Sequence, residues 1–272
     1  MNHPTDTTHA GAFAAASQPI SAQMLIHTDS AGLTAGTIHL SVAGQAVPVY
    51  RAAPEGRLNL PVVLVLSEIF GVHEHIADVA RRFAKQGYLA LAPDLFVRQG
   101  DAGQPASIAD LLRTIVAKTP DADVMADLDA CVAWAGANGG DIGRLAVTGF
   151  CWGGRITWLY GAHNAAVKAG AAWYGKLVGA HDARHPRHPV DIAAGLAVPV
   201  LGLYGEKDSG IALDTVAQMS AALAQGSSGS EFVVYPDAGH AFYADYRPGY
   251  VEADAKDGFA RTLAWFKAHG AA

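Results

Sequence analysis

Cysteine is scarce in this chain, which has two among 272 residues, Cys131 and Cys151. Two are too few for the disulfide framework of a small secreted protein, and we expect a reduced, cytoplasmic protein. The sequence also has no apolar run that approaches the roughly 18 residues of a membrane helix. The first thirty residues lack the basic start and apolar core of a signal peptide. No membrane partner is therefore expected.

Charge is also sparse, at 16% of residues, and its formal balance is −6 with no cluster of basic side chains. This excludes nucleic-acid binding as a main role. His73-Glu74-His75 lacks the His-x-x-x-His spacing that places two metal ligands on one helical face. His181, His185 and His188 lie in a polar, proline-containing stretch that favours a solvated loop over a zinc site. We expect no metal and no cofactor.

The chain has no internal repeat, low-complexity tract or linker rich in Pro, Gly or Ser. Its length and its hydrophobic content of 51% suit one large α/β domain. We predict an N-terminal arm at residues 1–30 and a single domain at 31–272. A monomer is favoured over an oligomer.

Apolar segments alternate with helical patterns along the domain. Residues 61–66 form an unbroken apolar run, typical of a strand buried on both faces of a parallel sheet. Further strands are predicted at residues 88–92, 144–148, 169–173, 200–204 and 232–235. Helices are predicted at residues 76–86, 122–137, 152–161, 213–225 and 249–269.

Residues 37–42 and 45–51 flank Ala43-Gly44 and predict an antiparallel hairpin at one sheet edge. Repeated strand-helix alternation indicates a doubly wound, mostly parallel sheet with right-handed crossovers. Residues 99–120 are long for a connection, so they are a candidate lid, with a short helix at 107–116.

One pentapeptide carries the chemistry: Gly149-Phe150-Cys151-Trp152-Gly153, preceded by an apolar strand. This is the pattern of a nucleophile elbow, with cysteine in the position that serine usually occupies. The tight turn lifts the central side chain above the sheet edge, and small neighbours let the following helix approach the strand. The sequence therefore predicts an α/β-hydrolase fold and an acyl-transfer enzyme with a thiol nucleophile.

Two downstream loops supply the partners that a nucleophile needs, in the chain order nucleophile, acid, histidine. Asp208 follows the strand at 200–204, and His240 follows the strand at 232–235. His240 would move the proton and Asp208 would hold the imidazole in the useful tautomer. Glu206 and Asp214 are alternative acids, and Asp208 is preferred for its distance from the strand end.

An oxyanion hole needs two backbone N–H groups. Trp152, directly after the nucleophile, supplies one, and Ile69 in the loop after residues 61–66 is our choice for the other. Glu68 lies in that loop, where a carboxylate near the pocket is costly to desolvate unless it is paired or shares a proton. A solvated loop acid is the alternative.

These segments resemble one family, the dienelactone hydrolases, also called carboxymethylenebutenolidases. The matching segments, in family order over residues 35–268, are Glu68-Ile69-Phe70-Gly71-Val72, Ala92-Pro93-Asp94-Leu95-Phe96-Val97-Arg98-Gln99, Gly149-Phe150-Cys151-Trp152-Gly153-Gly154, Trp173-Tyr174-Gly175, Gly205-Glu206-Lys207-Asp208 and Ala238-Gly239-His240-Ala241-Phe242.

The resemblance implies a Cys-His-Asp hydrolase that opens the enol-lactone ring of dienelactone to maleylacetate, without cofactor or metal. It implies that Glu68 keeps Cys151 a neutral thiol at rest and then takes part in generating the thiolate when substrate arrives. It also implies that arginine binds the substrate carboxylate, with Arg98 at one such position. Tyr174 matches a pocket residue, and Trp173 adjoins that pocket.

The chain departs from the family pattern at one position. A second family arginine lies four residues after the catalytic histidine, where this sequence has Ala244. The nearest arginine is Arg247, which could reach the same anion or could only pair with Asp245 on the surface. An anionic lactone is thus the expected substrate, and a general carboxylesterase of small aryl or xenobiotic esters is the alternative. A non-catalytic ligand binder would not need nucleophile, base, acid and oxyanion loop together.

Overall fold

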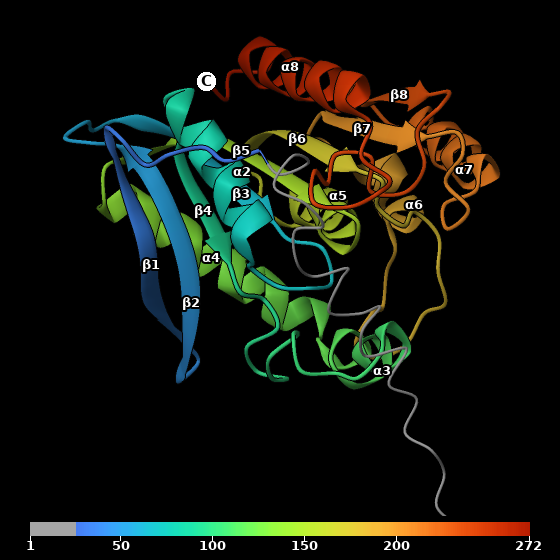
Figure 1. Cartoon of the computed structure of the whole chain (residues 1–272). Helices are drawn as coiled ribbons and strands as arrows, with labels where there is room; N and C mark the ends of the chain where they lie inside the picture. Colours follow the sequence, from blue (N-terminus) through green and yellow to red (C-terminus); the bar gives the residue numbers. More distant parts are fainter. Residues whose placement is uncertain (1–25) are drawn as a thin grey trace, which may run out of the picture.

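The computed structural model describes residues 26–272, so residues 1–25 of the predicted N-terminal arm lie outside the described residues. Within residues 26–272, eight strands form one sheet in the order β1-β2-β4-β3-β5-β6-β7-β8 (Figure 1). The antiparallel part comprises β1 (Leu33–Val42), β2 (Gln45–Pro54) and its neighbour β4 (Leu89–Pro93). From β4 onward, each strand is parallel to the one before it in the sheet. These strands are β3 (Leu60–Leu66), β5 (Gly140–Phe150), β6 (Val167–Trp173), β7 (Val200–Gly205) and β8 (Glu231–Tyr235). The predicted fold class is confirmed.

The edge hairpin turns through two residues with left-handed backbone. Ala43 has φ 49° and Gly44 has φ 81°, so the turn has the sense that matches the right-handed twist of the flanking strands. Val42 pairs with Gln45 across this turn. The hairpin predicted from Ala43-Gly44 is therefore present, and its strands extend a few residues further than expected.

Strand β3 shows why the sheet needs a helical layer on each face. Val62, Leu64 and Leu66 pack into one core cluster, whereas Val63 and Val65 pack into the other. All five side chains are fully buried. Burying each is worth roughly 1.5–3 kcal/mol relative to leaving it in water.

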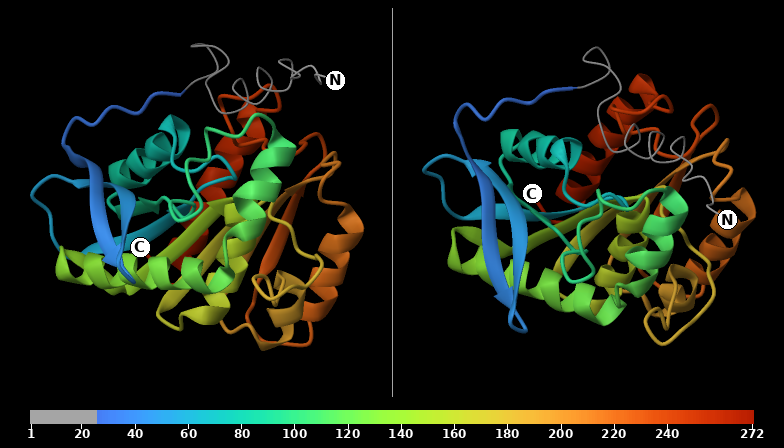
Figure 2. Two further views of the ribbon diagram at one scale, coloured as in Figure 1. Left: turned by 90° about the horizontal axis from the view of Figure 1, so that it is seen from below. Right: turned by 60° about the horizontal axis from the view of Figure 1, so that its bottom comes forward.

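Two helices cover one face, and three cover the other (Figures 1 and 2). On the first face lie α2 (Glu74–Lys85) and α8 (Glu252–Ala268). On the second face lie α4 (Asp121–Ala137), α5 (Trp152–His163) and α7 (Leu213–Leu223). Shorter pieces are α3 (Ile108–Thr114), η1 (Val116–Lys118), α6 (Pro189–Ile192) and η2 (Ala193–Gly195). In residues 26–272, no helix has the length and apolar character needed to cross a membrane.

Helix α2 follows directly from its sequence. Ile76, Val79, Ala80 and Phe83 recur at helical spacing and are all buried. The helix ends before Gly87, whose φ of 98° is a conformation that glycine adopts freely. Its basic residues cluster in the last turn, where they complement the helix dipole.

The strands and helices predicted from sequence are all present, with differences at their ends. Strand β5 begins at Gly140 rather than 144, because Gly140 and Asp141 pair with Leu60 and Pro61 ahead of an irregularity in the β3 pairing. The short helix within residues 99–120 is α3, capped by the Ser107 side chain, which accepts the N–H of Asp110 at 3.1 Å. A lid function for this segment stays a prediction.

The parallel strands β3 to β8 all end at the same edge of the sheet. The loops that follow β3, β5, β7 and β8 carry Glu68, Cys151, Asp208 and His240, respectively. Sheet topology alone therefore brings these four residues toward one region.

Candidate active site

The nucleophile elbow is a strained turn between β5 and α5. Cys151 has φ 53° and ψ −111°, outside the regions that a cysteine ordinarily adopts. Two backbone bonds hold the turn: the N–H of Cys151 donates to the Trp173 carbonyl at 3.0 Å, and the N–H of Gly153 donates to the Ser67 carbonyl at 3.1 Å. The ends of β6 and β3 thus brace the turn from both sides. Cys151 is partly exposed and not in a disulfide.

Three positions of the elbow need glycine because no space is left for a Cβ atom, and not because of their backbone angles. A Cβ added to Gly153 would lie 2.4 Å from the Leu66 carbonyl oxygen, and one on Gly154 would lie 2.5 Å from the Trp173 carbonyl oxygen. A Cβ on Gly149 would meet the Gly153 carbonyl oxygen at 2.2 Å. The close approach of α5 to the sheet therefore excludes larger residues at these three positions.

His240 and Asp208 form a hydrogen-bonded pair. His240 Nδ1 lies 2.7 Å from Asp208 Oδ2, and the Asp208 side chain is fully buried. The other oxygen, Oδ1, accepts the backbone N–H groups of Gly210 at 2.8 Å and Ile211 at 3.1 Å. One oxygen of Asp208 thus orients the imidazole, while the other holds the loop before α7. Glu206 and Asp214, the alternative acids, are both exposed.

A thiolate at Cys151 favours the protonated form of His240. Burial lowers the pKa of His240, but the hydrogen bond to Asp208, the interaction with the Cys151 sulfur and the charges of the thiolate and of Asp208 outweigh burial and raise the pKa to about 10, so the imidazolium is stabilised once sulfur has given up its proton. The ring of Tyr174 packs edge-on against the imidazole at 5.2 Å between centroids. His240 is therefore bonded to Asp208 and lies near enough to Cys151 for their charges to interact, as a base between a nucleophile and an orienting acid requires.

The two amides proposed for the oxyanion hole have no acceptor among the described residues. Neither the Ile69 nor the Trp152 N–H forms a hydrogen bond within residues 26–272. Trp152 begins α5, so its N–H also lies at the positive end of the helix dipole. Its ring packs against Phe96 at 4.6 Å, which fixes the start of the helix. Their use as an oxyanion hole stays a prediction.

Glu68 is a buried carboxylate with an incomplete set of partners. The side chain is 2% exposed. Its Oε2 accepts the Tyr246 hydroxyl at 2.5 Å and lies 3.9 Å from His73 Nε2. Its Oε1 has no hydrogen-bond partner among the described residues and lies 3.9 Å from Arg247 Nη1. A separation of 3.9 Å is too long for a hydrogen bond, so His73 and Arg247 act on Glu68 through charge.

These neighbours decide the charge state of Glu68. Burial raises its pKa, but His73, His75 and Arg247 together outweigh burial and lower the pKa to about 2. Its neighbours therefore favour the carboxylate form of Glu68. The interpretation as a solvated loop acid does not fit a side chain that is almost completely buried.

Tyr174 lies in the same cluster. Burial, followed by the charges of Glu68 and Cys151, raises the pKa of its hydroxyl well above the usual value. The residue is fully buried, and its hydroxyl has no partner among residues 26–272. Its backbone is left-handed, with φ 37°, a further strained position beside the nucleophile. A buried, unpartnered donor next to Cys151 is available to a substrate oxygen.

Two predicted substrate residues are engaged elsewhere. Arg98 forms a two-pronged ion pair with Asp127 of α4, at 2.5 and 2.7 Å. The ring of Trp173 is buried in the core against Tyr243, and its indole N–H donates to Thr148. Only the Trp173 carbonyl reaches the elbow. Substrate binding by Arg98 and Trp173 stays a prediction, and these contacts do not favour it.

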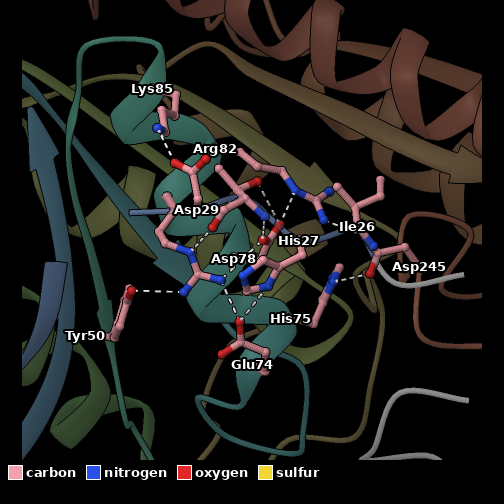
Figure 3. A network of polar contacts seen from close by, with 12 residues as sticks. Ile26, His27, Asp29, Tyr50, Glu74, His75, Asp78, Arg82, Lys85 and Asp245 are labelled. Atoms are coloured by element: carbon pink, nitrogen blue, oxygen red, sulfur yellow. Dashed lines mark hydrogen bonds and ion pairs between the residues drawn. The ribbon is translucent and has the colours of Figure 1, made fainter. Parts of the chain in front are cut away.

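Arg247 lies in the site, beside Glu68 and over the ring of Phe70 at 5.7 Å. The alternative, a surface pair with Asp245, does not occur. Asp245 is buried and instead bonds His75 Nδ1 at 2.9 Å and Arg82 Nη2 at 2.5 Å, in the network shown in Figure 3. Arg247 is thus free of any direct hydrogen bond to a carboxylate within residues 26–272.

Sequence reasoning missed Tyr246, His73 and the Asp245 network. Asp245, Tyr246 and Arg247 lie in a loop without periodicity between β8 and α8, where no pattern indicates which way a side chain points. A useful signal was the run of three hydrogen-bonding side chains shortly after His240. The three-histidine loop was also misjudged in part, because His188 is buried and accepts the Nε–H of Arg155 at 3.3 Å.

The sequence matches the model of the Dienelactone hydrolase family over residues 47–270. A relative from Salmonella typhimurium, named "Putative carboxymethylenebutenolidase", is 54% identical over 265 residues, covering 97% of this chain and 98% of the relative. A relative of the same name from Methylorubrum extorquens is 53% identical, covering 98% of this chain and 92% of the relative. A more distant relative from Bradyrhizobium, named "Probable 2-oxo-3-(5-oxofuran-2-ylidene)propanoate lactonase", is 29% identical and covers 85% of this chain and 93% of its own length.

Among solved structures, a dienelactone hydrolase from Klebsiella pneumoniae, titled "Putative", superposes with a TM-score of 0.85 at 54% identity. The match covers 86% of this chain and 98% of that one. A phosphotriesterase described as dienelactone hydrolase-like, from metagenomic libraries, superposes with a TM-score of 0.73 at 22% identity, which shows a shared fold alone.

Proposed function

Because this chain belongs to the dienelactone hydrolase family, we propose that it is a cysteine-dependent lactonase that opens enol-lactones, with dienelactone to maleylacetate as the type reaction. Family membership makes it a hydrolase acting on small esters or lactones. The observation that carries the finer proposal is the His240–Asp208 pair together with Cys151 at a strained elbow beside two unused amides.

The chemistry proceeds in two halves. His240 accepts the thiol proton, and the Cys151 sulfur attacks the lactone carbonyl carbon while Ile69 and Trp152 donate to the developing oxyanion. The ring C–O bond breaks, the enol oxygen leaves with the proton from His240, and a thioester remains on Cys151. Water then gives a proton to His240 and attacks the thioester, which releases the acid and returns the thiol. The released enol tautomerises to the ketone.

Asp208 supports both halves without changing its own protonation. Its bond to Nδ1 leaves Nε2 as the atom that exchanges protons with sulfur, leaving group and water. The raised pKa of His240 indicates that the imidazolium formed in each half is well stabilised. The Glu68 carboxylate is proposed to oppose a second negative charge in the resting site, the role that the family resemblance implies for it.

Arg247 is the proposed contact for a substrate carboxylate. Its side chain is 25% exposed and makes only a long charge contact with Glu68, so its guanidinium keeps donors for a planar anion. An anion bound there would draw Arg247 from Glu68 and change the charge balance around Cys151. The Tyr174 hydroxyl is the second donor available to the substrate.

A general carboxylesterase is the second candidate, since it would use the same triad. The unpaired donors of Arg247 and Tyr174 favour an anionic lactone over a neutral ester, whose binding requires no guanidinium. The protein is proposed to work in the cytoplasm, where Cys151 stays reduced.

Turnover of a dienelactone and of p-nitrophenyl acetate by wild type and Cys151→Ala tests the proposal. We expect Cys151→Ala to lose both activities by at least about a thousandfold, whereas Cys131→Ala, a buried cysteine in α4, keeps them. Turnover that survives in Cys151→Ala would eliminate the thiol mechanism. A neutral ester turned over with far higher kcat/KM than the anionic lactone would favour the carboxylesterase.

A further inference from the structure

The loop between β8 and α8 presents two adjacent residues to Glu68. Tyr246 donates its hydroxyl to Oε2, and Arg247 lies near Oε1. The loop is the same one that carries His240. One segment therefore carries both the proposed base, His240, and the two residues that lie against the Glu68 carboxylate.

Tyr246 is the residue that fixes the Glu68 carboxylate in place. Its 2.5 Å bond is the one hydrogen bond that the Glu68 side chain makes within residues 26–272. Burial and the charge of Glu68 raise the pKa of the Tyr246 hydroxyl, so the hydroxyl remains a donor at every working pH. The ring is 1% exposed and packs edge-on against His73 at 4.9 Å, so the side chain has little room to move.

The residue before Tyr246 anchors the loop to α2. The Asp245 carboxylate, fully buried, binds His75 and Arg82 of that helix and also accepts the N–H of Ile26 (Figure 3). The His75 ring also contacts that of Tyr246, at 5.2 Å. Tyr246 is thus placed by a rigid buried network and not by a free loop.

We propose that Tyr246 is a positioning residue, which holds the Glu68 carboxylate where its charge suppresses ionisation of Cys151 until substrate arrives. The inference rests on the thiol mechanism proposed above. Ser67, the residue before Glu68, accepts the backbone N–H of Gly153 at 3.1 Å, so the loop that carries Glu68 is bonded directly to the elbow that carries Cys151. Without the Tyr246 hydroxyl, Glu68 would either turn toward Arg247 or take up a proton more easily, and both changes weaken its repulsion of the thiolate.

The test is the alkylation rate of Cys151 by iodoacetamide in the absence of substrate, measured from pH 6 to 9 in Cys131→Ala protein. The variants are Tyr246→Phe, Glu68→Ala and the double variant. Tyr250→Phe is the matched control, because Tyr250 lies in the same loop and its hydroxyl has no hydrogen bond within residues 26–272. Because thiolate is the reactive form, the rate reports the ionised fraction directly.

We expect Tyr246→Phe to raise the alkylation rate at pH 7 by about fivefold or more. In the Glu68→Ala background the same substitution should change the rate less than about twofold, because the hydroxyl then has no carboxylate to hold. Tyr250→Phe should match the parent. Glu68→Gln, which also removes the carboxylate charge, replaces Glu68→Ala if the latter does not fold, and the same change of less than about twofold is expected in that background.

An unchanged rate in Tyr246→Phe, or an equal change with and without Glu68, would overturn the inference. The proposed function is judged separately, by turnover in Cys151→Ala. A Tyr246→Phe variant without effect on alkylation would leave that result untouched, and a surviving turnover in Cys151→Ala would not alter the alkylation data.

Discussion

The two arginines expected at the substrate carboxylate differ in how firmly each is already paired. Arg98 makes two short bonds to Asp127, whose side chain is fully buried. The one carboxylate near Arg247 among residues 26–272 is that of Glu68, at 3.9 Å. A substrate anion can recruit Arg247 at little cost, whereas recruiting Arg98 would leave a buried carboxylate unpaired.

Arg247→Ala should therefore raise KM for an anionic lactone by about tenfold and change KM for a neutral ester less than about twofold. Arg98→Ala should instead destabilise the protein, by about 3–5 kcal/mol, through the loss of Asp127's partner. Steady-state kinetics on both substrates and urea unfolding check the pair of expectations. Arg113→Ala, in an exposed ion pair, is the control. If Arg98→Ala instead raised KM for the anionic lactone alone, Arg98 would be the residue that binds the substrate carboxylate.

The raised pKa of His240 links stability to pH. Because the pKa rises from 6.5 in the unfolded chain to about 10 in the folded protein, the stabilisation is complete below pH 6.5 and is lost as pH rises toward 10. The excess stability of wild type over Asp208→Asn should shrink across this window. Urea unfolding at pH 6, 8 and 10 measures it, with the exposed Asp214→Asn as control. A stability difference between wild type and Asp208→Asn that widens with pH would contradict the raised pKa of His240.

At the scale of elements, the junction of β5 and α5 depends on glycine. Gly153→Ala should lower the melting temperature strongly and abolish activity, because its Cβ would overlap the Leu66 and Ser67 carbonyl oxygens, and backbone must then shift. Gly195→Ala, where nothing lies within 4 Å of the added Cβ, should change neither. Differential scanning calorimetry separates the two. A Gly153→Ala protein as stable and active as Gly195→Ala would show that the junction is not tightly packed.

The same elements show what the sequence could and could not predict. Residues 61–66 and α2 were predictable because a buried strand and an amphipathic helix each impose a residue pattern. Asp208 and His240 were predictable because parallel strands deliver the residues after them to one edge. The Tyr246–Glu68 bond and the Arg98–Asp127 pair were not, since each joins segments far apart in the chain and depends on side-chain directions that no local pattern encodes.

At the scale of the whole molecule, the proposed triad is spread across the sheet. Cys151, Asp208 and His240 follow β5, β7 and β8, respectively, which belong to one sheet. Asp245, in the loop between β8 and α8, bonds His75 of α2. No smaller part of the chain holds all of these residues. Loss of the site should therefore coincide with loss of the sheet.

Urea inactivation and the far-UV circular dichroism transition should accordingly share a midpoint. Tryptophan fluorescence, which reports the buried Trp158 and Trp173, should follow the same curve. Inactivation well below the structural midpoint would show that the loop carrying His240 opens on its own.

Because every residue of the proposed triad follows the end of a parallel strand, the opposite rim of the sheet is available for attachment. The turn before β8 contains Ser227, an exposed residue that lies among small neighbours. A ligation tag inserted there would fasten the protein to a solid support with the candidate active site turned away from that support. The protein could then be packed in a flow column without blocking entry of substrate.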